Sequence, residues 1–326
     1  MKAYDVVCLR PQADFLKVGV TPPAQLSIAY IAPDDPDLPV LVKRARALVI
    51  PAVGPRLDGS MFADSDVCLV QVTGAGVDRL DEAAMRANGI AVANVSGGSN
   101  SSLAEYAVAC ALTLHRRIAW ADREIREGNY SAIRSRMIAD SLQGIEGATV
   151  GVVGLGNIGL AVAEAFKRMG SQLVYFDPAV ADPAAADSLG ARALSLAELL
   201  EVSDVVTLHV PLLPETRGLI GVRELARMKP GAVLINAARG GVVDEGALAQ
   251  SLEQGSIGGA AVDVYTEEPP ESNPLLSLKG EGAQRVLFTP HIAGVTRQAW
   301  VHLFEAAWDN VVRVLERGEP ASNRLY

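Results

Sequence analysis

The sequence predicts an α/β fold with two doubly wound parallel-sheet domains, and three observations carry this prediction. Short β-rich segments alternate with helical segments along nearly all of the 326 residues, as is typical of parallel sheets covered by helices on both faces. A glycine-rich strand-to-helix turn lies near the middle, within residues 148–177. About 100 residues with strands of their own precede it, so the length favours two domains.

The first 99 residues are predicted to form a flavodoxin-like sheet. Strands are expected, with helical pieces between them, at residues 4–9, 26–31, 47–50, 67–72 and 90–93. One long amphipathic helix is then expected from Ser101 to about Glu127. It has Ser or Asn as its cap and is long enough to join two domains.

The central stretch is expected to bind a dinucleotide. Thr149–Val153 has the composition of a strand, and a GxGxxG turn follows it at Gly154, Gly156 and Gly159. These glycines provide a tight turn, close backbone approach to a pyrophosphate, and close packing of helix on strand. The helix beginning at Asn157 then directs free N–H groups toward the phosphates.

Asp177 favours NAD over NADP. It ends the next predicted strand, Gln172–Phe176, 18 residues after Gly159. A carboxylate at this place accepts hydrogen bonds from the ribose hydroxyls and repels a 2′-phosphate. A structural turn in some other α/β domain is the alternative, but it leaves the position of Asp177 unexplained.

The alternation continues to the end of the second sheet. Helices are expected at 194–200, 222–228 and 245–253, and strands at 205–209, 232–236, 259–262 and 286–288. The last helix, Arg297 to Arg317, carries an apolar stripe expected to pack on the N-terminal domain. The chain would then form a substrate-binding domain from 1–99 plus 297–326, an inserted Rossmann NAD-binding domain at 100–296, and a cleft between them.

The composition argues against several classes of function. A formal charge of −9 without a basic stripe is unlike a protein that binds nucleic acid or anionic membranes. Cys8, Cys68 and Cys110 lie singly in apolar runs, which predicts buried free thiols and no metal site. No apolar run approaches about 18 residues and the N-terminus lacks signal-peptide features, so a cytoplasmic location is expected.

Three polar residues follow the later strands. Arg239 follows LINAA, Glu268 follows AAVDVYTE, and His291 follows LFTP. Reduction of a 2-oxo acid requires a cation for the carboxylate, a proton donor and a hydride source, and arginine and a carboxylate-paired histidine suit the first two. Each residue alone is more often structural, whereas all three behind one dinucleotide motif favour catalysis.

The chain resembles the D-isomer-specific 2-hydroxyacid dehydrogenase family over nearly its whole length. Besides GLGNIG, the similar stretches are VTGAGVDRLD, NSSLAEYAVACALTLHRR, HVPLLPETRGLIG, MKPGAVLINAARGGVVDEGAL, AAVDVYTEEPP and TPHIAG. The resemblance implies a catalytic triple: Arg239 binds and polarises the substrate, Glu268 orients and charges His291, and His291 donates and accepts the proton. A C-terminal regulatory extension is not expected.

The resemblance also implies the binding residues. Those expected around NAD are Gly154, Gly156, Asn157, Ile158, Gly159, Asp177, His209, Thr216, Ala237, Ala238, Arg239, Asp263, His291 and Gly294. Those expected at the substrate are Gly74, Ala75, Gly76, Arg239 and His291. For His209 and Thr216 a structural role is the alternative, and for the loop at 74–76 the alternative is a plain turn.

The expected substrate is a small unphosphorylated 2-oxo acid such as glyoxylate or hydroxypyruvate. Pro51 and Val72 stand where phosphoglycerate dehydrogenases place arginines for the phosphate. The first alternative is a phosphoglycerate dehydrogenase-like enzyme. The other two are an NAD-sensing corepressor and an amino-acid dehydrogenase, whose chemistry needs a lysine at the substrate.

The apolar segment Ala104 to Met137 corresponds to the family's two-fold interface, which predicts a homodimer.

Overall fold

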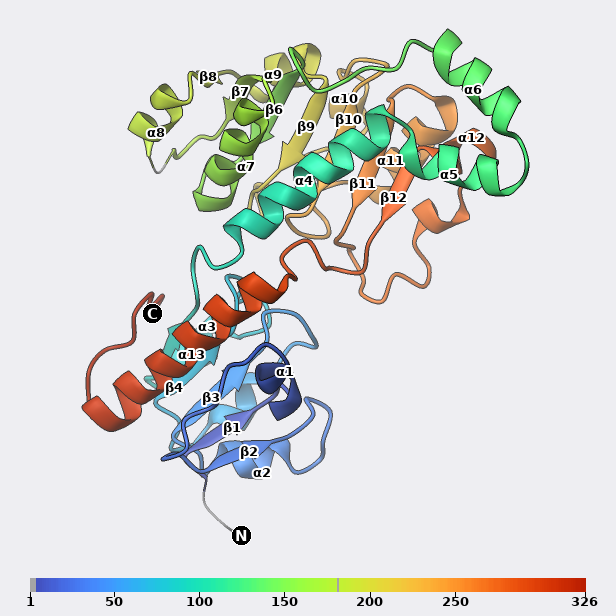
Figure 1. The fold of residues 1–326 in the computed structure, drawn as a ribbon. Coiled ribbons are helices and arrows are strands. Elements are labelled where there is room, and N and C mark those ends of the chain that lie inside the picture. Colours follow the sequence, from blue (N-terminus) through green and yellow to red (C-terminus); the bar gives the residue numbers. More distant parts are fainter. Residues whose placement is uncertain (1–3, 181) are drawn as a thin grey trace. The chain divides into compact units, whose positions relative to one another are not determined.

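The computed structural model describes residues 4–180 and 182–326 and divides into two compact units (Figure 1). Unit 1 combines the residues up to Ser99 with those from Val295 onward, and unit 2 spans Asn100–Gly294. Each unit contains one sheet in which every strand pair is parallel. The predicted fold class is therefore confirmed.

The sheet of unit 1 has the order β2-β1-β3-β4-β5. Its strands are β1 Val6–Cys8, β2 Ile28–Tyr30, β3 Ala47–Ile50, β4 Leu69–Val72 and β5 Ala91–Ala93. Its helices are α1 Gln12–Lys17, α2 Leu38–Val42, α3 Glu82–Ala87 and α13 Arg297–Arg317, with a 3₁₀ turn at Gly59–Phe62. Buried apolar side chains cover both faces, which explains why the strands are continuous hydrophobic runs.

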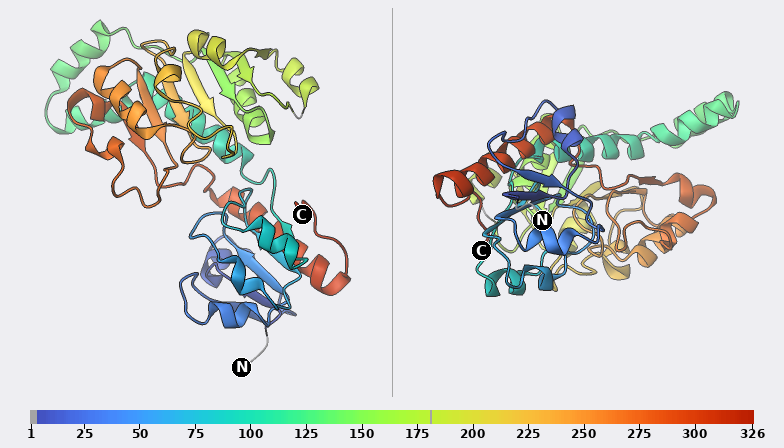
Figure 2. Two further views of the ribbon diagram at one scale, coloured as in Figure 1. Left: turned by 180° about the vertical axis from the view of Figure 1, so that it is seen from behind. Right: turned by 90° about the horizontal axis from the view of Figure 1, so that it is seen from below.

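Helix α13 completes the core of unit 1 and has the bounds expected from the sequence. Its Phe304 and Trp308 rings lie 4.6 and 5.3 Å from the ring of Phe15 in α1. Both views in Figure 2 show this red helix beside the blue strands of the same unit. Removing either ring would cost about 3–5 kcal/mol in the free energy of unfolding.

The sheet of unit 2 has the order β12-β11-β10-β9-β6-β7-β8. Its strands are β6 Thr149–Val153, β7 Gln172–Phe176, β8 Arg192–Ala193, β9 Val205–Leu208, β10 Val233–Asn236, β11 Gly259–Val262 and β12 Val286–Phe288. The chain order reverses beside β6, which places a switch point at the carboxyl ends of β6 and β9, where open α/β sheets bind ligands.

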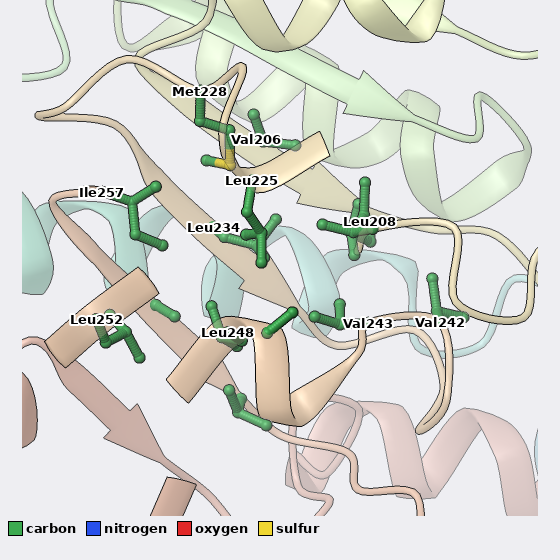
Figure 3. Close-up of a cluster of buried hydrophobic side chains, with 14 of the residues drawn as sticks. Val206, Leu208, Leu225, Met228, Leu234, Val242, Val243, Leu248, Leu252 and Ile257 are labelled. Carbon is green, nitrogen blue, oxygen red and sulfur yellow. The ribbon is translucent and has the colours of Figure 1, made fainter. Parts of the chain in front are cut away.

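Helices cover both faces of this second sheet. They are α4 Asn100–His115, α5 Ile118–Arg126, α6 Tyr130–Ala139, α7 Asn157–Arg168, α8 Pro183–Ser188, α9 Leu196–Val202, α10 Val222–Leu225, α11 Glu245–Gln254 and α12 Gly280–Gln284, with a 3₁₀ turn at Pro274–Ser277. Figure 3 shows one of the resulting cores, where Leu225, Met228 and Leu248 pack on the strand residues Val206 and Leu234.

The prediction of one long helix from Ser101 to Glu127 is wrong. The helix breaks after His115, where Arg117 adopts a left-handed conformation with φ 49°. The guanidinium groups of Arg117 and Arg136 lie 5.4 and 4.9 Å from the ring centre of Trp120. Together with the ion pair between Arg117 and Asp140, these contacts fix the turn at Arg117 against α6.

Two further expectations concern the thiols and membranes. All three cysteines are free; Cys8 and Cys110 are buried as predicted, but Cys68 is exposed, which corrects the prediction for that residue. In the part of the chain that the structure describes, no helix combines the length and apolar character required to cross a bilayer.

Candidate active site

The glycine turn between β6 and α7 has the geometry that a pyrophosphate requires. Gly154 has φ +90°, and a Cβ there would lie 2.8 Å from the backbone of His209. A Cβ on Gly159 would lie 2.0 Å from the carbonyl oxygen of Gly154, whereas one on Gly156 would meet nothing within 4 Å. Gly154 and Gly159 are thus needed for packing, whereas Gly156 leaves open space at the start of α7. The N-terminus of a helix is a kind of site at which proteins bind phosphates.

Asp177 follows β7 and connects that strand to the glycine turn. Its Oδ2 accepts the Leu155 N–H at 2.7 Å, and its Oδ1 accepts the Ala179 N–H at 2.8 Å. The residue is only half buried. Because each carboxylate oxygen can accept a second hydrogen bond, Asp177 can also receive ribose hydroxyls.

Arg239 lies on the loop after β10, and this loop is pressed against the loop after β11. A Cβ on Gly240 would lie 1.8 Å from the carbonyl oxygen of Tyr265, so only glycine fits there. Asn236 fixes the loop, because its side chain donates to the Arg239 carbonyl at 3.2 Å and accepts the Ala238 N–H at 3.2 Å. Ala237, also expected at the cofactor, is half buried in the same loop.

Glu268 and His291 form a pair at the ends of the neighbouring strands β11 and β12. His291 Nδ1 lies 3.0 and 3.1 Å from the two carboxylate oxygens of Glu268. The Tyr265 N–H donates to the same carboxylate at 3.1 Å. His291 has φ 55°, an uncommon conformation for a non-glycine residue, and its Nε2 has no partner among the described residues. Glu268 therefore orients the imidazole through Nδ1, and Nε2 is not engaged by the described residues.

Glu268 is held as a carboxylate. Burial alone would raise its pKa, but hydrogen bonds from His291 and the Tyr265 N–H, together with the charges of His291 and Arg239, hold its pKa below the ordinary range. Its contribution to folding stability is therefore present above the pKa of the unfolded state and is lost as the pH falls through the folded-state pKa. The influence of Arg239 on Glu268 also places the three strand-end residues in one electrostatic site.

Asp263, the buried residue after β11, anchors the loop that carries His291. Its Oδ1 accepts the Thr289 hydroxyl at 2.6 Å and the Ile292 N–H at 2.8 Å, and its Oδ2 accepts the Ala293 N–H at 2.8 Å. Tyr106 of α4 lies 2.7 Å from the Thr289 hydroxyl. Sequence reasoning identified Asp263 as a cofactor residue but not as this anchor, and missed Tyr106. The only available sequence signal for the anchor was the TPHIAG stretch, which ends at Gly294, the last residue of unit 2.

His209 and Thr216 occupy the end of β9 and the turn after it. His209 Nε2 lies 2.8 Å from the Thr207 hydroxyl, and burial lowers the pKa of His209 to about 4, so its ring is neutral at pH 7. The Thr216 hydroxyl donates to the Pro211 carbonyl at 2.5 Å and accepts the Leu213 N–H at 2.7 Å. The backbone of His209 thus packs against the glycine turn at Gly154, whereas the hydroxyl of Thr216 stabilises the turn in which it lies.

Gly74, Ala75 and Gly76 form a loop after β4, in unit 1. The Gly74 carbonyl accepts the Val95 N–H at 2.9 Å, and the Ala75 carbonyl accepts the Asn94 amide at 2.7 Å. Within residues 4–180 and 182–326, no backbone carbonyl accepts the N–H groups of Ala75 and Gly76. A loop whose carbonyls are bonded and whose amides have no backbone acceptor is suitable for a carboxylate. Over the same residues, no group of three His, Cys, Asp or Glu side chains could hold a metal ion.

Comparison with known proteins gives concordant similarities. Residues 108–293 match a family model described as "D-isomer specific 2-hydroxyacid dehydrogenase, NAD binding domain". The chain is 40% identical to the (S)-sulfolactate dehydrogenase of Chromohalobacter salexigens, over 80% of this chain and 82% of that protein. It is 38% identical to the D-3-phosphoglycerate dehydrogenase of Archaeoglobus fulgidus over 81% of this chain and 48% of that protein, so it spans about half of that relative's length. The holo crystal structure of Rhodotorula graminis D-mandelate dehydrogenase superposes with a TM-score of 0.83 at 26% identity, covering 99% and 98% of the two chains.

Proposed function

Because the chain belongs to the D-isomer specific 2-hydroxyacid dehydrogenase family, we propose that it transfers a hydride between NAD(H) and a small unphosphorylated 2-hydroxy or 2-oxo acid. The observation that carries this proposal is the hydrogen-bonded Glu268–His291 pair at 3.0 Å. It lies at the strand ends of the same sheet that carries the glycine turn.

The proposed roles follow from the contacts of each side chain. Glu268 accepts from Nδ1 of His291, which leaves Nε2 to give a proton to the carbonyl oxygen during reduction and to take it back during oxidation. Arg239 binds the substrate carboxylate through its planar guanidinium and polarises the carbonyl. NAD, when bound, supplies the hydride acceptor or donor. The residues proposed to hold it are Gly154, Gly156, Asn157, Ile158, Gly159, Asp177, His209, Thr216, Ala237, Ala238, Arg239, Asp263, His291 and Gly294.

The choice of NAD over NADP is tested by Asp177→Ala. We expect the variant to lose about tenfold or more of the preference for NADH, because the carboxylate no longer repels a 2′-phosphate or binds the ribose. The ratio of kcat/KM for NADH to that for NADPH measures this change. Glu198→Ala, which removes an exposed carboxylate from α9, is the control. An unchanged ratio in Asp177→Ala would remove the ribose assignment.

The proposal of an unphosphorylated substrate rests on unit 1. Val72 is fully buried, and Pro51 offers no charge beside the Gly74 loop. The second candidate, a 3-phosphoglycerate dehydrogenase-like activity, is favoured by the similarity to the Archaeoglobus enzyme. The deciding experiment follows NADH oxidation with glyoxylate, hydroxypyruvate and phosphohydroxypyruvate. Strong preference for the phosphorylated acid would support the second candidate, and inactivity with intact NADH binding would favour an NAD-sensing role.

We also propose that the chain forms a homodimer through α5 and α6. These helices expose Ile118, Ile125, Tyr130 and Ile138 at 52, 49, 59 and 63% of their surfaces, and Figure 2 shows α6 projecting from unit 2. Such an apolar arm is suited to burial against a second copy. A light-scattering mass near the chain mass of 34.3 kDa would contradict the dimer.

The three free cysteines fit a reducing compartment, and we propose that the protein is located in the cytoplasm.

A further inference from the structure

Arg79 is a buried arginine bound to the loop that follows β3. Only 4% of the surface of Arg79 is exposed. Nε donates to the Pro55 carbonyl at 2.8 Å, and Nη1 donates to the Pro51 and Val53 carbonyls at 2.8 and 3.3 Å. The backbone carbonyl of Arg79 also accepts the Leu57 N–H at 2.9 Å. Four hydrogen bonds from one residue therefore fix the course of this loop.

The loop held by Arg79 touches the proposed carboxylate cradle, Gly74 to Gly76. A Cβ on Gly74 would lie 2.8 Å from the Cβ of Ala52. Ala52 lies between Pro51 and Val53, whose carbonyls both bind Nη1. The arginine thus holds the backbone on both sides of the residue that contacts the cradle.

Among the described residues, the charge of Arg79 has no acidic partner. No carboxylate lies within ion-pair distance of its guanidinium in the described part of the chain, and Nη2 is buried without a hydrogen-bond partner there. Burial lowers the pKa of Arg79, but an arginine stays protonated in proteins. A cation compensated only by carbonyl dipoles leaves positive potential beside the loop, and an arriving carboxylate would supply the missing negative charge.

We propose that Arg79 is a specificity-determining positioning residue for the substrate. It sets the distance between the wall at 51–55 and the cradle at 74–76, and its charge strengthens binding of an anion at that cradle. The inference rests on the proposed function, because it takes the cradle as the site of the substrate carboxylate. Arg79 itself acts through the loop and does not contact the substrate.

The test compares Arg79→Met and Arg79→Lys with the wild type. KM and kcat are measured for 2-oxo acids of increasing side-chain size, with oxamate binding in the presence of NADH measured by calorimetry. We expect Arg79→Met to raise KM and the oxamate Kd by about tenfold, an effect of the size seen when a residue acts on a ligand site through its neighbours, while kcat changes by less than about threefold. Arg79→Lys keeps the charge but not the fork, so a smaller increase and an altered ranking of side-chain sizes are expected.

Arg86→Met is the matched control, because Arg86 lies on α3 of the same unit, its side chain is 58% exposed, and its contacts, an ion pair with Glu82 and the ring of Tyr326, lie away from the loop at 51–55. An unchanged KM and oxamate Kd in a folded Arg79→Met, or equal changes in Arg86→Met, would overturn the inference. If Arg79→Met does not fold, Arg79→Lys decides, and wild-type KM values and ranking in it would be contrary evidence. Failure of the proposed function is distinct, since the wild type itself would then reduce no 2-oxo acid.

Discussion

His291→Ala is expected to lower kcat by about two to four orders of magnitude, the usual effect of losing a positioned general acid or base. The Kd for NADH is expected to stay nearly unchanged, because the proposed cofactor contacts depend mainly on the glycine turn and Asp177. Stopped-flow reduction of the 2-oxo acid and fluorescence titration with NADH measure the two quantities. Glu268→Gln should lower kcat less than His291→Ala does. The amide oxygen can still accept the hydrogen bond from Nδ1 of His291, but the amide is neutral and no longer stabilises a protonated imidazole.

The control for this experiment is His302→Ala, because His302 is an exposed histidine on α13 with no place in the site. Wild-type kinetics in His302→Ala would show that losing a histidine elsewhere in the chain does not by itself lower kcat. An equal loss of NADH affinity and turnover in His291→Ala would instead mean that His291 is a cofactor residue without a role in proton transfer.

Arg239→Ala should lower kcat/KM for the 2-oxo acid by about two to three orders of magnitude, because truncating one partner of a desolvated charge pair costs about 3–4 kcal/mol. KM should rise because the guanidinium is proposed to bind the substrate carboxylate, and kcat should fall because it is proposed to polarise the carbonyl. Arg239→Lys should recover only part of the loss, because an ammonium lacks the planar fork. The pKa of Glu268 should rise in Arg239→Ala, since one of the charges that lowers it is removed.

Arg217→Ala is the matched control for the clamp. Arg217 is exposed, and one of its guanidinium nitrogens would lie 3.4 Å from a Cβ on Gly241, close to the same loop. Wild-type kcat/KM in Arg239→Ala would exclude the clamp. A comparable loss in Arg217→Ala would point to disturbance of the loop as the cause.

Much of the fold could be predicted because its signals are local. Gly154, Gly156 and Gly159 fix a turn through steric limits that act within a few residues, and the stripe on Arg297–Arg317 predicts the bounds of α13. The break at Arg117 could not be predicted, because no Gly or Pro marks it and its partners Arg136 and Asp140 approach only in three dimensions. Strand β8 was missed because its two residues are exposed and carry no hydrophobic pattern.

The candidate site was predictable in its residue types but not in its contacts. Strand ends meet along one edge of a parallel sheet, so Arg239, Glu268 and His291 could be expected to lie near one another. The contacts depend on side-chain and loop directions, which the sequence does not show. Examples are the close approach of Gly240 to Tyr265 and the hydrogen bonds of both Asp263 carboxylate oxygens to the loop that carries His291. The burial of Arg79 was missed for the same reason, since charged residues usually lie at the surface.

The place of α13 in unit 1 also bears on the order in which the chain folds during synthesis. Residues 100–294 are continuous and can fold as they leave the ribosome. The strands before them wait for Phe304 and Trp308, which are made on the order of ten seconds or more later. Until then the face that receives these rings is an exposed apolar surface, and such surfaces make partly folded chains prone to aggregate.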